Sequence, residues 1–274
     1  MFEKVNPCHP DKLADRIGGA IVDLGYKLEK NPKIAGECLI GHGVCHIIIE
    51  TSVKYNETDI KNIVARIAGS DVKLDLHIVP QDVHLANNQS EEIKCGDNGI
   101  FKACEVSNEE QKLTDIIKKL FDENPSDGKY IIDENTNTII ACQSNIATSD
   151  LKDRLSKYGF KEVVANPLGD WTGGIDVDTG ATNRKLGSDM GRAVTGGGLH
   201  FKDISKSDVA VNIYLHKIAN EKHLKEVTCK CAIGDKELII NGNKVSYKEV
   251  TDEAMNYINA IGGFEKLAEW GLIR

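Results

Sequence analysis

Residues 166–208 read NPLGDWTGGIDVDTGATNRKLGSDMGRAVTGGGLHFKDISKSD, and the rest of the chain is organised around this stretch. It holds nine of the 25 glycines, and residues 184–206 carry five Lys or Arg side chains against two carboxylates, Asp189 and Asp203. The whole chain has a formal net charge of −8. A basic, glycine-rich stretch in an acidic protein predicts a specific polyanion site, because backbone N–H groups and cations can approach phosphate together. A long surface loop with a solvated charge cluster is the alternative that composition leaves open.

Length and composition indicate an ordinary globular protein. A chain of 274 residues, 41% hydrophobic and 28% charged, can bury a sizeable core in one to three domains. It contains no apolar run near the ~18 residues that a membrane span requires. The N-terminal sequence MFEKVNPCHPDK is not an apolar signal segment, so we expect a cytoplasmic protein. The acidic net charge argues against general binding to nucleic acid.

The eight cysteines contain no C-x-x-C spacing and are expected to be reduced, largely buried thiols. Cys229 and Cys231 would place two thiols on one face of a strand, but no second pair of metal ligands is evident near them in the sequence. Cys8 is adjacent to His9, although adjacency alone does not make a nucleophilic pair. The chain has no Walker A, HExxH or GxGxxG motif.

Hydrophobic spacing predicts alternating helices and strands. Pro10 and Asp11 suit the first turn of a helix, with His9 at its entrance, where anionic ligands bind favourably. Residues 81–94 are predicted to form a mobile polar loop, and 95–99 a tight turn. The predicted helices are 12–30, 56–68, 109–122, 149–158, 209–221, 251–261 and 264–270. The predicted strands are 35–40, 45–50, 72–79, 130–132, 138–142, 163–165, 226–233, 238–240 and 244–246. This order indicates an α+β fold with antiparallel or mixed sheets, each covered by helices on one face.

Seven short motifs, in the same order, resemble those of the methionine adenosyltransferases, also called S-adenosylmethionine synthetases. They are NPCHPDKLADRI (6–17), the glutamates Glu37 and Glu50, GDNG (96–99), DGK (127–129), DTGATNRK (178–185), GGGLHFKDISKSD (196–208) and AIG (232–234). The chain departs from the family pattern at Cys8, Asn98 and Asp170, which replace Gly, Gln and Arg, and it is shorter than usual members. The resemblance implies three related α+β units in a pseudo-threefold arrangement. Their expected bounds are 1–105, a shortened middle unit 106–168, and 169–274.

The resemblance also implies an activity. The family joins ATP and L-methionine into S-adenosylmethionine and cleaves the tripolyphosphate to phosphate and diphosphate, with Mg²⁺ and K⁺ as cofactors. The thioether sulfur attacks the 5′ carbon and needs no base, so catalysis should consist of positioning and cationic stabilisation of the leaving group. The resemblance implies a homodimer with active sites at the interface, with a tetramer as the alternative, and no nucleic-acid or membrane partner is expected.

The resemblance assigns roles to individual positions. Glu50 and Asp97 are expected from one chain, and the phosphate-binding lysines from the other. Asp97, Asp127 and Asp178 would contact methionine or the nucleoside. Trp171 would stack on adenine, with Ile233 packed on the same base. The implied triphosphate ligands are His9, Lys129, Arg184, Lys185, Lys202 and Lys206; the implied metal ligands are Asp11 and Asp208 for Mg²⁺ and Glu37 for K⁺; the implied methionine ligands are Glu50 and Gln81.

Two other function classes remain open. One is a polyphosphate or nucleotide hydrolase that keeps the phosphate-binding residues but no longer uses methionine. The other is a non-catalytic module that binds ATP or S-adenosylmethionine. Phosphate release without S-adenosylmethionine formation would indicate the first, and ligand binding without turnover the second.

Overall fold

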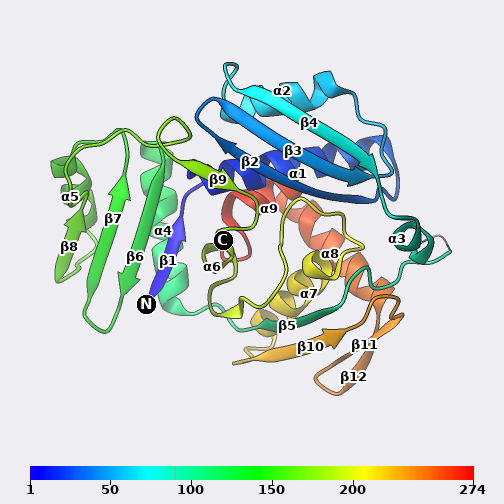
Figure 1. Ribbon diagram of the computed structural model, residues 1–274. Helices are drawn as coiled ribbons and strands as arrows, with labels where there is room; N and C mark the ends of the chain where they lie inside the picture. The colour runs from blue at the N-terminus through cyan, green and yellow to red at the C-terminus, as the bar shows by residue number, and fades with distance from the viewer. Residues whose placement is uncertain (90) are drawn as a thin grey trace.

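The computed structural model describes residues 1–89 and 91–274, which form a mixed α+β fold (Figure 1). The helices are α1 Pro10–Leu28, α2 Glu57–Ala68, α3 Val83–Asn88, α4 Asn108–Glu123, α5 Thr148–Ser156, α6 Leu186–Met190, α7 Ser207–Glu221, α8 Tyr247–Ile261 and α9 Phe264–Trp270. The strands are β1 Phe2–Val5, β2 Ile34–Gly41, β3 Val44–Thr51, β4 Lys73–Pro80, β5 Gly99–Ala103, β6 Gly128–Asp133, β7 Thr138–Gln143, β8 Glu162–Ala165, β9 Thr179–Ala181, β10 Val227–Cys231, β11 Glu237–Ile240 and β12 Asn243–Ser246.

Two four-stranded sheets share one topology. In the order β4-β3-β2-β9, the hairpin β2–β3 is antiparallel, and β4 returns through α2 to lie parallel to β3. In the order β1-β6-β7-β8, the hairpin β6–β7 is antiparallel, and β8 returns through α5 to lie parallel to β7. The pairs β10–β5 and β11–β12 are also antiparallel. The predicted mixed sheets are therefore confirmed.

Three of the strands pair with strands that lie far away in the sequence, and these pairings connect the different parts of the chain. Strand β1, which precedes α1, pairs with β6; strand β5, which precedes α4, pairs with β10; and strand β9, which precedes α7, pairs with β2. Each of these strands hydrogen-bonds to a strand of a different segment rather than to the hairpin that follows it. The structure does not test the proposed unit bounds or the pseudo-threefold arrangement, and both stay predictions.

Helix α1 lies against the sheet that contains β2 and β3 (Figure 1). Most of its predicted apolar face is buried, with Ile17 and Ile21 fully inaccessible, whereas Leu28 at its C-terminal end is half-exposed. Burial of each such side chain contributes roughly 1.5–3 kcal/mol. The helix begins as predicted, because His9 is the N-cap residue, followed by Pro10 and Asp11. The position of α1 therefore fixes the orientation of the HPDK motif relative to the sheet.

The predicted loop 81–94 is partly wrong. Its first half forms α3, and the Asp82 side chain caps it by accepting from the backbone N–H groups of His84 (2.9 Å) and Leu85 (3.2 Å). Residue 90 of that prediction lies outside the described residues. The sequence prediction also missed β1, β5, β9 and α6, which are too short to show a clear hydrophobic period. Within the described part of the chain, no helix is long and apolar enough to cross a membrane.

Lys4 on β1 is 1% exposed, and its Nζ donates to the carbonyl oxygens of Ser188 (3.0 Å), Trp270 (3.0 Å) and Ile273 (2.9 Å). It therefore fastens β1 to α6 and to the C-terminal segment. Burial lowers the pKa of Lys4 from 10.5 to about 7. The unfolded chain consequently keeps a proton that the folded chain releases between these two values.

This lowered pKa predicts that stability rises with pH. Between pH 7 and pH 9 the unfolded chain binds more protons at Lys4 than the folded chain, so the free energy of unfolding should increase. We expect Lys4→Met to lack this increase and the exposed control Lys27→Met to keep it. Urea denaturation at the two pH values measures both. Parallel pH dependence in wild type and Lys4→Met would contradict the lowered pKa.

Candidate active site

The N-terminus of α1 gathers several of the predicted site residues. His9 Nδ1 accepts from the Asp11 backbone N–H at 3.2 Å. The Asp11 carboxylate accepts from the Ala181 backbone N–H (2.8 Å), and its other oxygen lies 2.5 Å from Lys185 Nζ. Arg184 Nη1 lies 3.6 Å from Asp11 Oδ1. Burial is the main cause that lowers the pKa of His9 to about 4, so its imidazole is neutral near pH 7 in this arrangement.

Gly180 permits this approach of β9 to α1. A Cβ atom there would lie 2.0 Å from the carbonyl oxygen of Pro10, which belongs to rigid helical backbone. Only glycine therefore allows Ala181 and Lys185 to reach Asp11 without displacing either segment.

We expect Gly180→Ala to destabilise the fold by about 1–3 kcal/mol, because the new methyl group overlaps backbone that cannot move away. Gly187→Ala is the matched control, because a Cβ there meets no atom within 4 Å and alanine favours its helix α6. Thermal unfolding followed by circular dichroism measures both variants. Equal melting temperatures for the two would contradict the close approach.

Three further predicted residues lie beside this helix terminus. Asp127 Oδ2 accepts from the Gly174 backbone N–H at 2.9 Å. Burial raises the pKa of Asp127, and the nearby charges of Asp178 and Asp11 raise it further. Trp171 lies over the same segment, since a Cβ on Gly173 would be 2.7 Å from both its Cζ3 and Asp127 Oδ2. Together with the residues at the N-terminus of α1, they make up what we call the first group. It consists of His9, Asp11, Asp127, Trp171, Asp178, Arg184 and Lys185.

Lys129 lies at the margin of the first group. Its charge is among those that lower the pKa of His9. However, its Nζ pairs with Glu3 Oε1 at 3.1 Å, and both side chains are half-exposed. The predicted phosphate role of Lys129 therefore requires the ammonium to leave Glu3.

A second group forms around the N-terminus of α7. Lys206 is its largely buried N-cap residue, and Lys202 Nζ lies 2.6 Å from Asp208 Oδ2. The Ser207 hydroxyl donates to the Asp97 carbonyl at 3.3 Å, which places the 96–99 turn beside Lys206. Asn98 Oδ1 accepts from the Ile233 backbone N–H at 2.9 Å. The second group consists of Asp97, Lys202, Lys206, Asp208 and Ile233.

The two groups lie at different points along the edge of β2. Ala181 pairs with Leu39, whereas Lys202 pairs with Ala35, four residues away. At the rise of a β-strand this separates the two pairings by about 13 Å. No hydrogen bond or ion pair between residues 1–89 and 91–274 joins a member of one group directly to a member of the other.

This arrangement bears on two sequence predictions. Within one chain, Arg184 and Lys185 face Asp11 whereas Lys202 faces Asp208, so the expected triphosphate ligands fall into two sets. Asp97 lies beside Lys206 of the same chain, although the resemblance assigns Asp97 and the phosphate-binding lysines to different chains. The division of the site between two chains stays a prediction.

The remaining predicted residues lie on the sheet of β2 and β3. Glu37 accepts from the Thr182 hydroxyl. Glu50 is exposed on β3 and pairs with Ala35, the residue that also pairs with Lys202. It therefore lies at the same end of β2 as the second group. Gln81 follows β4, the strand beside β3, and its Oε1 atom is buried without a hydrogen-bond partner among the described residues. A buried, unsatisfied amide oxygen is unfavourable in the free protein and suits a ligand-binding residue.

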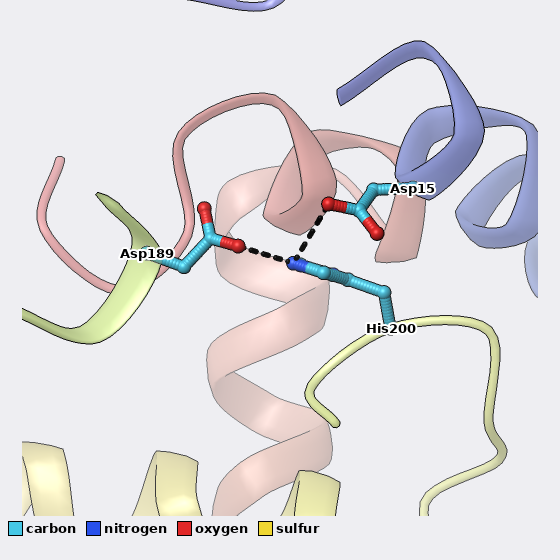
Figure 2. Close-up of side chains that lie close together, drawn as sticks. All are labelled: Asp15, Asp189 and His200. Carbon is cyan, nitrogen blue, oxygen red and sulfur yellow. Dashed lines mark hydrogen bonds and ion pairs between the residues drawn. The ribbon is translucent and has the colours of Figure 1, made fainter. Parts of the chain in front are cut away.

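A buried ion network, which the sequence did not predict, joins residues 12–15 of α1 to residues 189–200. Figure 2 shows three of its members, Asp15, Asp189 and His200. Lys12 Nζ lies 2.6 Å from Asp189 Oδ1 and 3.2 Å from Asp15 Oδ2. His200 Nε2 lies 2.8 Å from Asp189 Oδ2 and 3.7 Å from Asp15 Oδ2. Asp15 Oδ1 also accepts from the Asn183 backbone N–H at 2.8 Å. The network thus connects α1 to α6 and to the loop that carries His200.

Charge pairing explains why this network is stable. Burial raises the pKa of Asp189, but Lys12 and His200 outweigh burial and hold this pKa well below its ordinary value. Asp15, Asp189 and His200 are grouped closely enough for metal ligands, but the Lys12 ammonium already lies against all three. We therefore assign the cluster a structural role. The sequence contained a signal for part of this network, because Lys12 and Asp15 lie three residues apart on one helix face and can form an ion pair there.

The residues implied for metals have suitable donor chemistry. Mg²⁺ is commonly held by one or two carboxylates together with substrate phosphates. Asp11 and Asp208 each offer a carboxylate beside a lysine, which matches a site that binds phosphate and Mg²⁺ together. Glu37 and Thr182 offer the hard oxygen atoms that suit K⁺.

A cavity of about 530 Å³ opens beside Trp171 and is lined by Asn145, Ile146, Ala147, Asp170, Trp171 and Thr172. Asp170, which departs from the family pattern, accepts from the backbone N–H (2.8 Å) and the hydroxyl (2.7 Å) of Thr148. It therefore fixes the start of α5 rather than contacting the first group.

Comparisons with known proteins agree with the resemblance of the motifs. Residues 1–91 match the family model of the S-adenosylmethionine synthetase N-terminal domain. S-adenosylmethionine synthase from Borrelia garinii subsp. bavariensis is 28% identical over 269 residues, covering 75% of this chain and 68% of that protein. The enzyme of the same name from Borreliella afzelii is 43% identical over 67 residues, 24% of this chain and 17% of that protein.

The solved structures add a likeness in fold. An unusual S-adenosylmethionine synthetase from Campylobacter jejuni superimposes with a TM-score of 0.74 at 20% identity, covering 99% of this chain and 94% of the other. The chain thus has the fold of that S-adenosylmethionine synthetase over almost its whole length. The match of residues 1–91 to the family's N-terminal domain and the 28% identity to the Borrelia garinii protein agree with the resemblance of the motifs.

Proposed function

We propose that this protein is a methionine adenosyltransferase, which forms S-adenosylmethionine from ATP and L-methionine and releases phosphate and diphosphate. The observation that carries this proposal is the first group. Motif residues that are far apart in the sequence meet at the N-terminus of α1. They are His9, Asp11, Asp127 and residues 178–185. That terminus favours anions, and its cations suit a triphosphate.

Each set of residues has a distinct part in the proposed reaction. Arg184 and Lys185 bind the triphosphate and stabilise the charge that it gains as the C5′–O bond breaks. Trp171 stacks on adenine in the adjacent cavity, and Ile233 packs against the same base from the second group. Glu50 binds the ammonium group of methionine, and Gln81 forms a hydrogen bond with the same substrate. These two contacts hold the sulfur atom in line with C5′ of ATP.

Mg²⁺ at Asp11 and Asp208 would neutralise phosphate charge, and K⁺ at Glu37 would add a fixed positive charge. The proposed cleavage of tripolyphosphate uses the same metal ions and the same Lys and Arg side chains. Lys202 and Lys206 grip the phosphates from the second group, and Lys129 joins them when it leaves Glu3. His9 lies where it can donate a hydrogen bond to a phosphate oxygen through the nitrogen that Asp11 leaves free.

A homodimer, or a tetramer of such dimers, follows from the separation of the two groups. Within one chain, the segments that carry Lys185 and Lys206 attach about 13 Å apart on β2, and Lys185 faces Asp11 whereas Lys202 faces Asp208, which supports a site completed by a second chain. A two-fold interface places the first group of one copy opposite the second group of the other. The sheet that contains β2 and β3 exposes the apolar side chains of Leu39 and Ile48, which such an interface would bury.

One incubation tests the function. The protein is given ATP, L-methionine, Mg²⁺ and K⁺, and chromatography follows S-adenosylmethionine and phosphate. We expect both products, with methionine required for the first. Phosphate release from tripolyphosphate without S-adenosylmethionine would indicate the hydrolase instead, and ligand binding without any product would indicate the non-catalytic module.

A further inference from the structure

Two thiols meet beside the second group. The Cys95 and Cys231 sulfur atoms lie 3.2 Å apart. Both thiols donate to the Asp97 carbonyl oxygen, at 3.0 Å from Cys95 and 3.5 Å from Cys231. The sulfurs would have to approach by only about 1 Å to reach a disulfide bond length.

The backbones around these thiols are already held together. The Cys95 N–H donates to the Asp235 carbonyl at 2.9 Å, and the Cys95 carbonyl accepts from the Gly234 N–H at 2.8 Å. Cys231 pairs with Gly99 in the β10–β5 ladder. Segments that are 136 residues apart in sequence are therefore fixed side by side, and closing a bond between the thiols requires little rearrangement.

Exposure distinguishes this pair from another in the same chain. Cys38 and Cys45 have sulfurs 3.6 Å apart, but both residues are buried at 2% and 0% exposure. Cys231 is partly exposed, whereas Cys95 lies behind it at 0% exposure. An external reagent can therefore reach one member of the Cys95–Cys231 pair and neither member of the other. When Cys95 is ionised, the Cys231 S–H can turn from the Asp97 carbonyl to the Cys95 sulfur, and this contact lowers the pKa of Cys95 and raises the pKa of Cys231. Access rather than acidity therefore makes Cys231 the attacking thiol, and Cys95 is the resolving one.

We infer that Cys95 and Cys231 are a redox-active dithiol, which closes to an intramolecular disulfide by exchange with a low-molecular-weight disulfide. The Cys231 thiolate attacks one sulfur of the reagent RSSR, forms the mixed disulfide and expels one RS⁻. The Cys95 thiolate then attacks the Cys231 sulfur and expels the second RS⁻. The two protein thiols are oxidised, RSSR is reduced, and the two thiol protons pass to the two RSH products.

The consequence for the site rests on the proposed function. Oxidation removes both S–H donors from the Asp97 carbonyl, in the turn that also touches Ser207 and Ile233. Loss of two such hydrogen bonds should slow S-adenosylmethionine formation by roughly tenfold. Reduction should reverse the loss.

The test treats the reduced, folded protein with oxidised glutathione, then alkylates the remaining thiols and maps the peptides by mass spectrometry. We expect a Cys95–Cys231 linkage that lowers the intact mass by about 2 Da, reversed by dithiothreitol. Cys38 and Cys45 should remain alkylatable only after unfolding. In Cys231→Ser and Cys231→Ala no intramolecular bond should form.

Glutathione retained on Cys231 without linkage to Cys95, linkage between other cysteines, or no reaction of the pair would each overturn the inference. The mass readout does not require enzymatic activity. A disulfide that forms in a protein without S-adenosylmethionine synthesis would therefore support the dithiol and reject the proposed function. S-adenosylmethionine synthesis in a protein that forms no such disulfide would support the proposed function and reject the dithiol.

Discussion

Lys12→Met is expected to lower the free energy of unfolding by about 3–5 kcal/mol, because it leaves buried carboxylates without their cation. Lys12 is 0% exposed, and its ammonium contacts both Asp15 and Asp189. Burial disfavours the charge of Lys12, yet these two carboxylates raise its pKa above the ordinary value. A loss of this size is a large part of the 5–15 kcal/mol that stabilises a typical domain.

Urea denaturation followed by circular dichroism measures the effect, and Lys27→Met, on the exposed side of the same helix, is the control with an expected change near zero. Adding Asp189→Asn to Lys12→Met should recover part of the loss, because it removes one unpaired buried charge. A loss below about 1 kcal/mol for Lys12→Met, or strictly additive effects in the double variant, would show that the network does not stabilise the fold as described.

Lys185→Ala and Lys206→Ala are each expected to reduce the rate of S-adenosylmethionine formation by roughly 100- to 1000-fold, the usual effect of removing one preorganised donor to a developing charge. Neither change should unfold the protein, since Asp11 keeps its hydrogen bond from Ala181 and Lys206 has no described side-chain partner to lose. The exposed Lys225→Ala is the charge-matched control and should leave the rate unchanged.

Mixed assemblies separate a shared site from a site within one chain. If Lys185 and Lys206 of opposite chains form each site, a heterodimer of Lys185→Ala with Lys206→Ala contains one intact site and should regain roughly half of the wild-type activity. A heterodimer of Lys185→Ala with Asp127→Asn changes two members of the first group, so both of its sites are damaged and activity should not return. If neither mixture recovers activity, the proposed sharing is wrong.

Local pattern was enough to predict most helices and hairpins. Helices α1, α2 and α4 have apolar residues at helical spacing, and the Gly41–Gly43 and Asn241–Gly242 turns join strands that are neighbours in sequence. The His9–Asp11 start of α1 was predicted for the same reason, because capping depends on residues within one turn. The motifs also identified the members of both groups, with their roles still to be tested.

The sequence by itself therefore determined the local elements, the α+β class and the chemistry of the site residues. Tertiary structure alone decided which of those residues meet. Lys12 finds Asp189 across 177 positions, and β9 attaches to β2 beside Leu39, whereas Lys202 attaches beside Ala35. Such pairings depend on the path of the chain between distant residues, which no local hydrophobic period or turn preference encodes. This is why Lys185 and Lys202, close in sequence, belong to different groups, whereas Asp97 and Lys206, far apart in sequence, lie together.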